Sequence, residues 1–143
     1  MKTVLITGAA SGLGWALSRQ AFALGHRVIL VDMNAALLAS RADTLAGEDP
    51  ARVTFRDLDV TDGDAVQALV HWVRDNELSL DVLINNAGIT HRSLAEKTRM
   101  AVFRKVMAVD WQAPVELAVG FLPLLKKSRG GIINIGSMAG WMP

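Results

Sequence analysis

The 143-residue sequence contains no cysteine and no tyrosine. Without cysteine there is no disulfide framework, no cysteine-based zinc site and no thiol nucleophile, and we expect a protein of a reducing compartment, the cytoplasm. Without tyrosine, the chain lacks one of the side chains that act as general acid or base in proton transfer. Both absences narrow the chemistry open to these residues.

The sequence also lacks an excess of either charge and any long apolar run. Lys and Arg together number 15 against 14 Asp and Glu, a formal net charge of +1, which removes the electrostatic argument for a nucleic-acid partner or an anionic membrane. No apolar run approaches the ~18 residues that span a bilayer. Met1 and Lys2 lead directly into a short apolar segment, without the apolar region of a secretory signal. We therefore expect neither nucleic acid nor membrane as a partner.

What the sequence does contain is an alternation of apolar runs and helical patterns. This alternation predicts one α/β domain over residues 1–143, with a parallel sheet covered by helices on both faces. Strands are predicted at 3–7, 27–32, 52–60, 80–84 and 131–137, and helices at 12–24, at 35–45, from a capping box at Thr61 and Asp64 onward, and at 96–127 with a break near Asp110 and Pro114.

Three glycines, Gly8, Gly12 and Gly14, separate the first predicted strand from the first helix. Glycine lets the backbone approach a pyrophosphate, and the N–H groups of a helix N-terminus attract anions. By themselves such glycines are also common in turns that bind nothing. The buried face of the helix is predicted from its three- and four-residue spacing to be Leu13, Ala16, Leu17, Ala21 and Leu24.

Asp32 ends the second predicted strand, eighteen residues beyond Gly14. A spacing of ~20 is typical of the acid that binds the ribose 2′-hydroxyl of a dinucleotide. A carboxylate there repels a 2′-phosphate, and the next residues, Met33 and Asn34, bring no arginine, so the sequence favours NAD(H) over NADP(H). The alternative is that Asp32 is a turn residue or a helix cap.

Further polar residues follow the third and fourth predicted strands. Asp59 is placed to accept a hydrogen bond from an adenine amino group, or simply to precede a helix. Asn85 and Asn86 offer paired amides beside Ala87 and Gly88, where a flat ring can approach the backbone, although the pair is equally suited to hold a turn by its own hydrogen bonds.

Ser137 follows the fifth predicted strand, where its hydroxyl can bind a carbonyl or alcohol oxygen. Its neighbours do not keep the G-x-S-x-G spacing of a hydrolase nucleophile. The histidines, His26, His71 and His91, are far apart and form no metal-ligand pair, so we predict no metal site. Because every polar cluster follows a strand, and ligands of such sheets bind at the carboxyl ends of the strands, we predict one ligand crevice.

Together these segments resemble the short-chain dehydrogenase/reductase family, and the match runs from residue 3 to the end of the chain. The family has a cofactor-binding turn of the form T-G-x-x-x-G-x-G. Its other motifs are an acid that selects NAD, a pair of residues in the adenine pocket, the sequence N-N-A-G and the segment that carries the active-site serine. The matching residues here are Thr7–Gly14, Asp32, Asp59–Val60, Asn85–Gly88 and Ile133–Ser137 with Ala139–Gly140.

The resemblance implies a Rossmann-type doubly wound sheet, incomplete at its C-terminus after the fifth strand, that binds NAD, with NADP less favoured. It implies hydride transfer between this cofactor and an alcohol or carbonyl substrate. The implied cofactor-binding residues are Thr7, Gly8, Ser11, Gly12, Leu13, Gly14, Asp32, Met33, Asp59, Val60, Asn86, Ala87, Gly88 and Val109.

The resemblance also implies catalytic roles. Ser137 would hold the substrate oxygen, and Asp110 stands where the family has an asparagine that helps to hold a proton relay through water. Asp110 is equally suited to a helix N-terminus, where the dipole favours an acid. The family's Y-x-x-x-K motif, the source of the general acid/base, is absent from these residues. Such assistance is typically worth ~10²–10⁴ in rate, so this chain alone is predicted to be inactive.

The fifth strand is predicted to be a bare apolar edge of Ile132, Ile133 and Ile135, which is a template for strand pairing. We therefore expect either a piece of a longer protein or a homo-oligomer that covers this edge. Two alternatives to the oxidoreductase remain at this point: a non-catalytic nucleotide-binding module, and an inactive truncated remnant. The residues do not identify the substrate.

Overall fold

A computed structural model describes residues 1–76 and 78–137, so the Ala139–Gly140 pair of the last motif lies outside the described residues. Short 3-10 turns at Pro50–Arg52 and Ala95–Lys97 and a π-helical segment at Ala108–Gln112 complete the helices and strands. These are β1 (Thr3–Thr7), α1 (Gly12–Ala23), β2 (Arg27–Asp32), α2 (Ala35–Ala46), β3 (Val53–Asp57), α3 (Gly63–Asp75), β4 (Val82–Asn85), α4 (Met100–Met107), α5 (Ala113–Ser128) and β5 (Gly131–Asn134).

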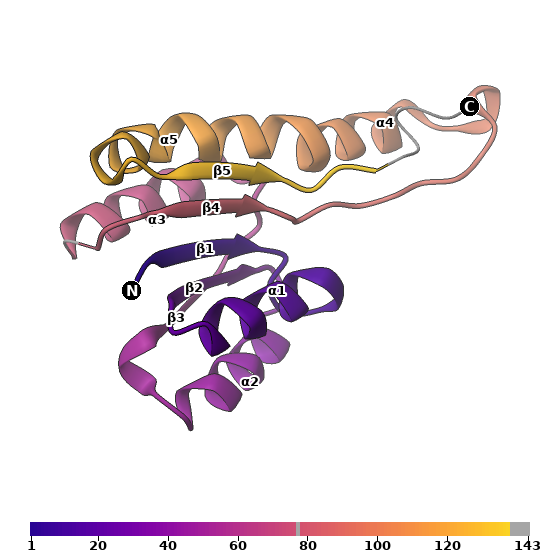
Figure 1. Ribbon diagram of the computed structural model, residues 1–143. Helices are drawn as coiled ribbons and strands as arrows, with labels where there is room; N and C mark the ends of the chain where they lie inside the picture. Colours follow the sequence, from indigo (N-terminus) through magenta and orange to yellow (C-terminus); the bar gives the residue numbers. More distant parts are fainter. Residues whose placement is uncertain (77, 138–143) are drawn as a thin grey trace.

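The five strands form one parallel sheet in the order β3-β2-β1-β4-β5 (Figure 1). In the centre of the sheet, Leu5 of β1 pairs with Ile29 of β2 and with Leu83 of β4. The chain first builds outward from β1 to β3, then returns to the other side of β1 for β4. This reversal confirms the predicted doubly wound, Rossmann-type sheet and places a switch point between β1 and β4.

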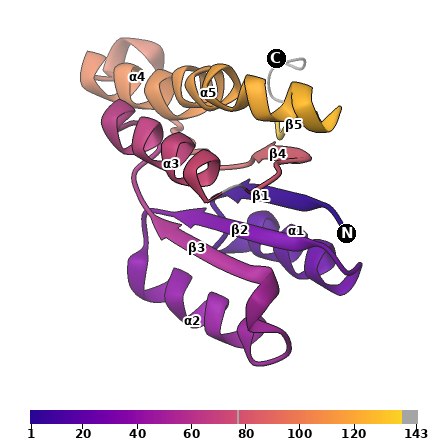
Figure 2. The ribbon, with the colours of Figure 1, turned by 90° about the vertical axis from the view of Figure 1, so that its left-hand side faces the viewer.

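Helices cover both faces of the sheet, α1 and α2 on one and α3, α4 and α5 on the other (Figure 2). Alternate residues of a strand point to opposite faces, so Leu5 packs with α3 and α5, whereas Val4 and Ile6 pack with α1 and α2. Both faces of the central strands are therefore buried. This double burial is the reason why they consist of continuous apolar runs.

The prediction for the buried face of α1 is correct only in part: Leu17 and Ala21 are partly buried against the core, but the fully buried residues of the helix are others. Leu13 is 53% exposed and Leu24 is 63% exposed, whereas the buried residues are Gly14, Ser18 and Phe22. Ser18 satisfies its hydroxyl by donating to the carbonyl oxygen of Gly14, 2.7 Å away. Small residues one turn apart let α1 approach the sheet closely, and this close contact outweighs the apolar stripe.

Two details around β3 also differ from prediction. The strand covers only Val53–Asp57 of the expected 52–60, because Pro50–Arg52 forms a 3-10 turn before it. The cap of α3 is Asp62 rather than Thr61: its carboxylate accepts hydrogen bonds from the N–H groups of Asp64 (3.0 Å) and Ala65 (3.1 Å). Thr61 instead donates its N–H and its hydroxyl to the Asp59 carboxylate.

The predicted break in the last long helical region is confirmed, in the form of the π-helical segment Ala108–Gln112. The N–H of Ala113 there donates to the carbonyl of Ala108, five residues earlier. Pro114 has no N–H to donate to the carbonyl of Asp110, so one α-helical hydrogen bond is missing at this point. The wider π-helical turn places Asp110 near the segment that follows β4, at the carboxyl end of the sheet.

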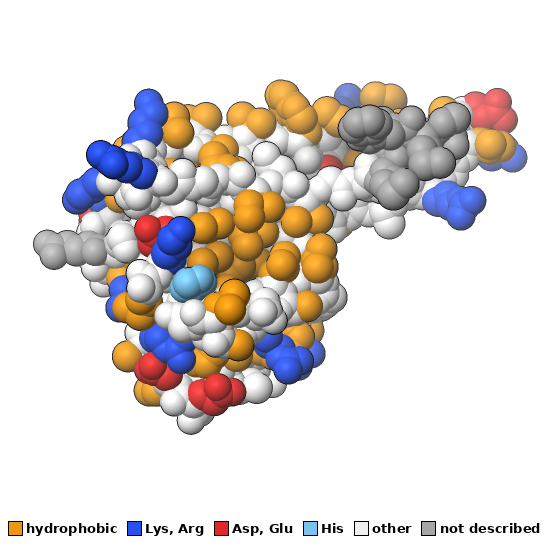
Figure 3. Space-filling view, in the orientation of Figure 1, with side chains coloured by type: hydrophobic (Ala, Val, Ile, Leu, Met, Phe, Trp, Pro, Cys, Tyr) orange, Lys and Arg blue, Asp and Glu red, His pale blue; other side chains and the backbone are white. Residues whose placement is uncertain are grey.

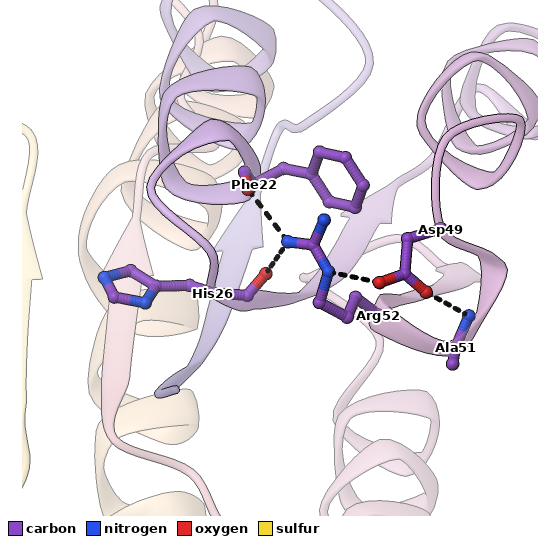
Figure 4. A network of polar contacts seen from close by, with 5 residues as sticks. All are labelled: Phe22, His26, Asp49, Ala51 and Arg52. Carbon is purple, nitrogen blue, oxygen red and sulfur yellow. Dashed lines mark hydrogen bonds and ion pairs between the residues drawn. The ribbon is translucent and has the colours of Figure 1, made fainter.

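A cluster around Arg52 joins α1, β2 and β3 at the amino end of β2 (Figure 4). The Arg52 Nη1 donates to the carbonyl oxygens of Phe22 (2.9 Å) and His26 (3.2 Å), and its Nε donates to Asp49 (2.7 Å). The guanidinium also lies 4.0 Å from the centre of the Phe22 ring. This cluster satisfies carbonyl groups at the end of α1 and lies at the opposite end of β2 from Asp32.

Candidate functional site

The polar residues singled out in the sequence do gather at one edge of the sheet. Because all five strands are parallel, their carboxyl ends lie side by side, and Thr7, Asp32 and Asn85 are the last residues of β1, β2 and β4. Asp59 follows β3 by two residues, and Ser137 follows β5 by three. The structure therefore forms a single polar edge, as the sequence predicted.

Thr7 and Asn86 fasten the ends of β1 and β4 together across the switch point. The buried Thr7 hydroxyl accepts hydrogen bonds from the backbone N–H groups of Asn86 and Ala87, both at 3.0 Å. The Asn86 side-chain amide donates to the carbonyl oxygen of Thr7 at 2.9 Å. These two side chains hold the turns at this edge in place.

Two of the three glycines are required by packing within the protein. A Cβ on Gly14 would overlap the carbonyl oxygen of Gly8, so α1 begins in direct contact with the end of β1. Gly8 has a φ of +65°, and a Cβ there would lie 2.9 Å from the side-chain nitrogen of Asn86. The turn is thereby pressed against the segment that follows β4.

Gly12 differs, because a Cβ at this position would face open space. Its φ is +50°, and it is the first residue of α1. The preceding Ser11 makes no side-chain capping bond, and the first helical hydrogen bond runs from the N–H of Trp15 to the carbonyl of Ser11 (3.1 Å). Among the described residues, the N–H groups of Gly12, Leu13 and Gly14 therefore remain for an external acceptor, in a position that fits a diphosphate.

The Asp32 carboxylate joins the glycine turn to the start of α2. One oxygen accepts the N–H of Ala10 at 3.0 Å, and the other accepts the N–H of Asn34 at 2.9 Å. The turn role that the sequence left open is therefore real. A carboxylate has about four acceptor positions, so it retains capacity for a ribose hydroxyl. The neighbouring Met33 is 73% exposed and lies at the rim.

The Asp59 carboxylate is held by Thr61, whose N–H (2.9 Å) and hydroxyl (2.8 Å) both donate to it. These hydrogen bonds, the N–H first, lower the pKa of Asp59 below its ordinary value of 3.8, with a further contribution from the charge of Lys105. The group thus remains an ionised acceptor at neutral pH. Val60 and Val109 are buried in the same core cluster, against which Ala87 packs, so an apolar floor lies close to this carboxylate.

Asp110 and Ser137 line one hollow of about 770 Å³, together with Asn86 and Gly88. Asp110 accepts the backbone N–H of Ile89 at 2.9 Å. It therefore ties the segment after β4 to the helix and does not cap a helix N-terminus, because the helical backbone continues on both sides of it. Ser137 is exposed at the end of β5.

The structure also gives Asn85 contacts that the sequence reasoning missed. The Asn85 side-chain nitrogen donates to Asn134 on β5 (2.8 Å) and to the carbonyl of Pro114 (3.3 Å), while its buried Oδ1 has no hydrogen-bond partner among residues 1–76 and 78–137. A signal was present, since both asparagines end strands that the fold pairs. Arg41 of α2 is a residue that the sequence reasoning missed altogether: it lies far from any strand end in sequence, yet its Nε donates to the carbonyl of Ala10 (3.2 Å).

Within the described part of the chain, no group of three or more His, Cys, Asp or Glu side chains is arranged to hold a metal ion. In the same residues no helix is long and apolar enough to cross a membrane. The site is thus a polar sheet edge with a helix N-terminus, two structured carboxylates and an apolar floor. These features are typical of α/β proteins that bind dinucleotides.

Comparison with known proteins identifies the family. The family model of the short chain dehydrogenases matches residues 2–143, and the chain belongs to this family. Estradiol 17-beta-dehydrogenase 2 of Mus musculus is 33% identical over 145 residues, which cover 99% of this chain and 38% of that protein.

Solved structures give the same result. A short-chain dehydrogenase from Streptomyces avermitilis superposes with a TM-score of 0.89 at 31% identity, covering 99% of this chain and 51% of that one. The alcohol dehydrogenase of the archaeon Thermococcus sibiricus, solved with 5-hydroxy-NADP, gives a TM-score of 0.89 at 26% identity, with 94% of this chain and 57% of that one covered. The chain therefore spans about half the length of these relatives, or less.

Proposed function

We propose that this protein is an NAD(H)-dependent oxidoreductase acting on an alcohol or carbonyl compound, and that residues 1–143 form its cofactor-binding part. The observation that carries the proposal is the start of α1, where unpaired N–H groups and the open side of Gly12 leave room for a diphosphate. Asp32 lies at the end of β2 and accepts the N–H of Ala10 in the glycine turn. Its carboxylate supports the choice of NAD over NADP. Membership of the short-chain dehydrogenase family supports the reaction type.

The proposed roles follow from where the side chains lie. The bound cofactor would supply the hydride or accept it. Ser137 would bind the substrate oxygen, Asp110 would fix the segment after β4 through Ile89, and Asp59 would accept the adenine amino group above the floor of Val60 and Val109. No tyrosine is present to serve as general acid/base, so residues 1–143 alone would bind cofactor without turning substrate over.

The proposal is tested by calorimetric titration with NADH, using two matched glycine variants. Gly12 and Gly25 lie at opposite ends of α1, both have positive φ (+50° and +82°), and a Cβ on either meets nothing within 4 Å. Each alanine substitution therefore costs a similar backbone strain, about 1 kcal/mol. We expect Gly12→Ala to weaken NADH binding at least tenfold and Gly25→Ala to leave it unchanged within about twofold.

An absence of heat and of thermal shift with the unmodified protein at millimolar NADH contradicts the proposal. Equal weakening by both variants contradicts the placement of the diphosphate at α1.

A second candidate is a non-catalytic nucleotide-binding module, which the lack of tyrosine favours. Both candidates bind NADH, so they are separated by hydride transfer, followed by absorbance at the nicotinamide band. A sterol-type secondary alcohol is the first substrate to assay, because one relative is an estradiol dehydrogenase. Oxidation of the alcohol supports the enzyme, whereas binding without turnover by the whole gene product supports the module.

A further inference from the structure

A positive charge lies beside the adenosine end of the proposed cofactor site, on an element that the sequence reasoning had not connected with it. Arg41, in the second half of α2, is half-buried and reaches across to the glycine turn, where its Nε donates to the carbonyl of Ala10 at 3.2 Å. Its guanidinium lies 4.9 Å from the centre of the Trp15 ring. Helical side chains point toward their helix N-terminus, so this reach is in the favoured direction.

Arg41 and Asp32 both form hydrogen bonds with the backbone of Ala10. The N–H of Ala10 donates to Asp32 at 3.0 Å, while the carbonyl of Ala10 accepts from Arg41. Ala10 therefore bridges the Asp32 carboxylate and the Arg41 guanidinium. Even so, neither ion pair found among the described residues includes either side chain: these pairs are Arg52 with Asp49 and Arg74 with Asp75.

This arrangement leaves Arg41 with donors to spare. Only its Nε has a hydrogen bond in the described structure, and a guanidinium carries five N–H donors. The Trp15 ring and the Ala10 carbonyl restrict the side chain, which lowers the entropy lost when it binds an anion. A guanidinium fixed in this way is suited to a phosphate, which it can bind through two donors.

The acid at the end of the second strand marks the ribose 2′-position of a dinucleotide, and an arginine close to that position accommodates a 2′-phosphate. Asp32 by itself disfavours this phosphate. We propose that Arg41 is a specificity-determining residue for the cofactor: its guanidinium offsets the charge of Asp32, so that the protein accepts NADP as well as NAD. This inference rests on the proposed function, since it concerns the same dinucleotide site.

The test compares calorimetric titrations of NAD⁺ and NADP⁺ with the protein and its Arg41→Gln variant. We expect the unmodified protein to bind NADP⁺ within about tenfold of NAD⁺. In Arg41→Gln the affinity for NADP⁺ should be about tenfold lower than in the unmodified protein, because a charged hydrogen bond is lost. The affinity for NAD⁺ should change by less than about twofold. Arg19→Gln, an exposed change of the same charge on α1, should alter neither affinity.

Two further variants separate charge from support of the turn. Arg41→Lys keeps the charge but loses the planar fork, and we expect its NADP⁺ affinity to lie between those of the unmodified protein and Arg41→Gln. Asp32→Asn should strengthen NADP⁺ binding several-fold in the presence of Arg41 and much less in its absence, a coupling that a double-mutant cycle measures. Circular dichroism of each variant checks the fold.

Equal weakening of NAD⁺ and NADP⁺ by Arg41→Gln overturns the inference, because Arg41 would then only position Ala10. So does an unchanged ratio of the two affinities. The proposed function fails in a different way: in that case neither cofactor produces heat with the unmodified protein.

Discussion

Asp59 illustrates how a single side chain acquires its properties from its immediate neighbours. Its carboxylate is exposed, yet Thr61 donates both an N–H and an O–H to it, and the pKa of the group is lowered. An acceptor that stays ionised well into acid is useful beside an adenine amino group. The same hydrogen bonds take Thr61 out of the helix-capping role that the sequence assigned to it, and Asp62 fills that role instead.

We predict that Thr61→Val raises the pKa of Asp59 toward 3.8, because the hydroxyl donor is lost while the N–H donor remains. The carboxyl carbon of Asp59, followed by NMR during acid titration, measures this change. A lowered folded-state pKa stabilises the protein above the unfolded pKa, and the contribution is lost as pH falls through the folded value. The stability difference between variant and parent should therefore shrink below pH 3.8.

Thr44→Val serves as the control, since the Thr44 hydroxyl donates only to the Ser40 carbonyl of its own helix. This change should leave the Asp59 titration where it was. An unaltered Asp59 titration in Thr61→Val would show that the hydroxyl does not contribute.

At the scale of elements, α1 is fixed at both ends by different means. Its first residues pack through glycine against β1. At its other end, Arg52 from the turn before β3 holds the carbonyl of Phe22 in the last turn and that of His26 just beyond the helix (Figure 4). A cation near a helix C-terminus also interacts favourably with the helix dipole. The orientation of α1, and with it the direction of the N–H groups at the cofactor site, therefore depends on contacts at both ends.

We predict that Arg52→Ala lowers the free energy of unfolding by about 1–3 kcal/mol, because the Phe22 and His26 carbonyl oxygens lose a charged donor. Chemical denaturation measures the effect. The matched variant is Arg74→Ala, whose exposed ion pair with Asp75 should contribute less than about 1 kcal/mol. Equal losses from the two variants would show that the Arg52 cluster is no more than a surface ion pair.

At the scale of the whole molecule, one long apolar surface stands uncovered. It runs along α4 and α5, at the top of the space-filling view (Figure 3), where apolar side chains recur every three or four residues and therefore share a helical face. Its members, each at least 41% exposed, are Met100, Phe103, Met107, Trp111, Val115, Val119 and Leu122.

A second apolar surface lies on the edge strand. Apolar side chains gather over the region of β1 and β4 (Figure 3). On neighbouring β5, Ile132 and Ile133 are 37% and 50% exposed, and Ile135, just after the strand, is 40% exposed, as the sequence predicted for a bare edge. Large contiguous apolar patches mark sites of association. Both surfaces fit either alternative expected from the sequence, a piece of a longer protein or a homo-oligomer.

We predict that the protein self-associates through α5 and that Val119→Glu, at a position 66% exposed, shifts it toward monomer. Burying a charge in an apolar interface is strongly unfavourable. Sedimentation velocity over a range of micromolar concentrations measures the shift. Leu24→Glu, at a similarly exposed apolar position at the end of α1, is the control and should leave association unchanged. A monomer in the unmodified protein contradicts the prediction.

The order of strands and helices along the chain, the parallel sheet and the polar residues at its carboxyl edge could all be predicted from the sequence. These features follow from local chemistry: continuous apolar runs indicate strands buried on both faces, and glycine or proline marks the points where the backbone must turn. The placement of Thr7, Asp32 and Asn85 at adjacent strand ends then follows from the parallel arrangement alone.

Which side chain contacts which partner could not be predicted, because it depends on how the elements pack. The buried face of α1 is set by how closely the helix must approach β1, so Gly14 and Ser18 are buried and Leu13 is not. Arg52 and Arg41 find their partners at carbonyl groups about thirty residues away, through long flexible side chains whose reach no local pattern encodes. Backbone carbonyl groups are alike in sequence, and only folding makes particular ones neighbours of a particular guanidinium.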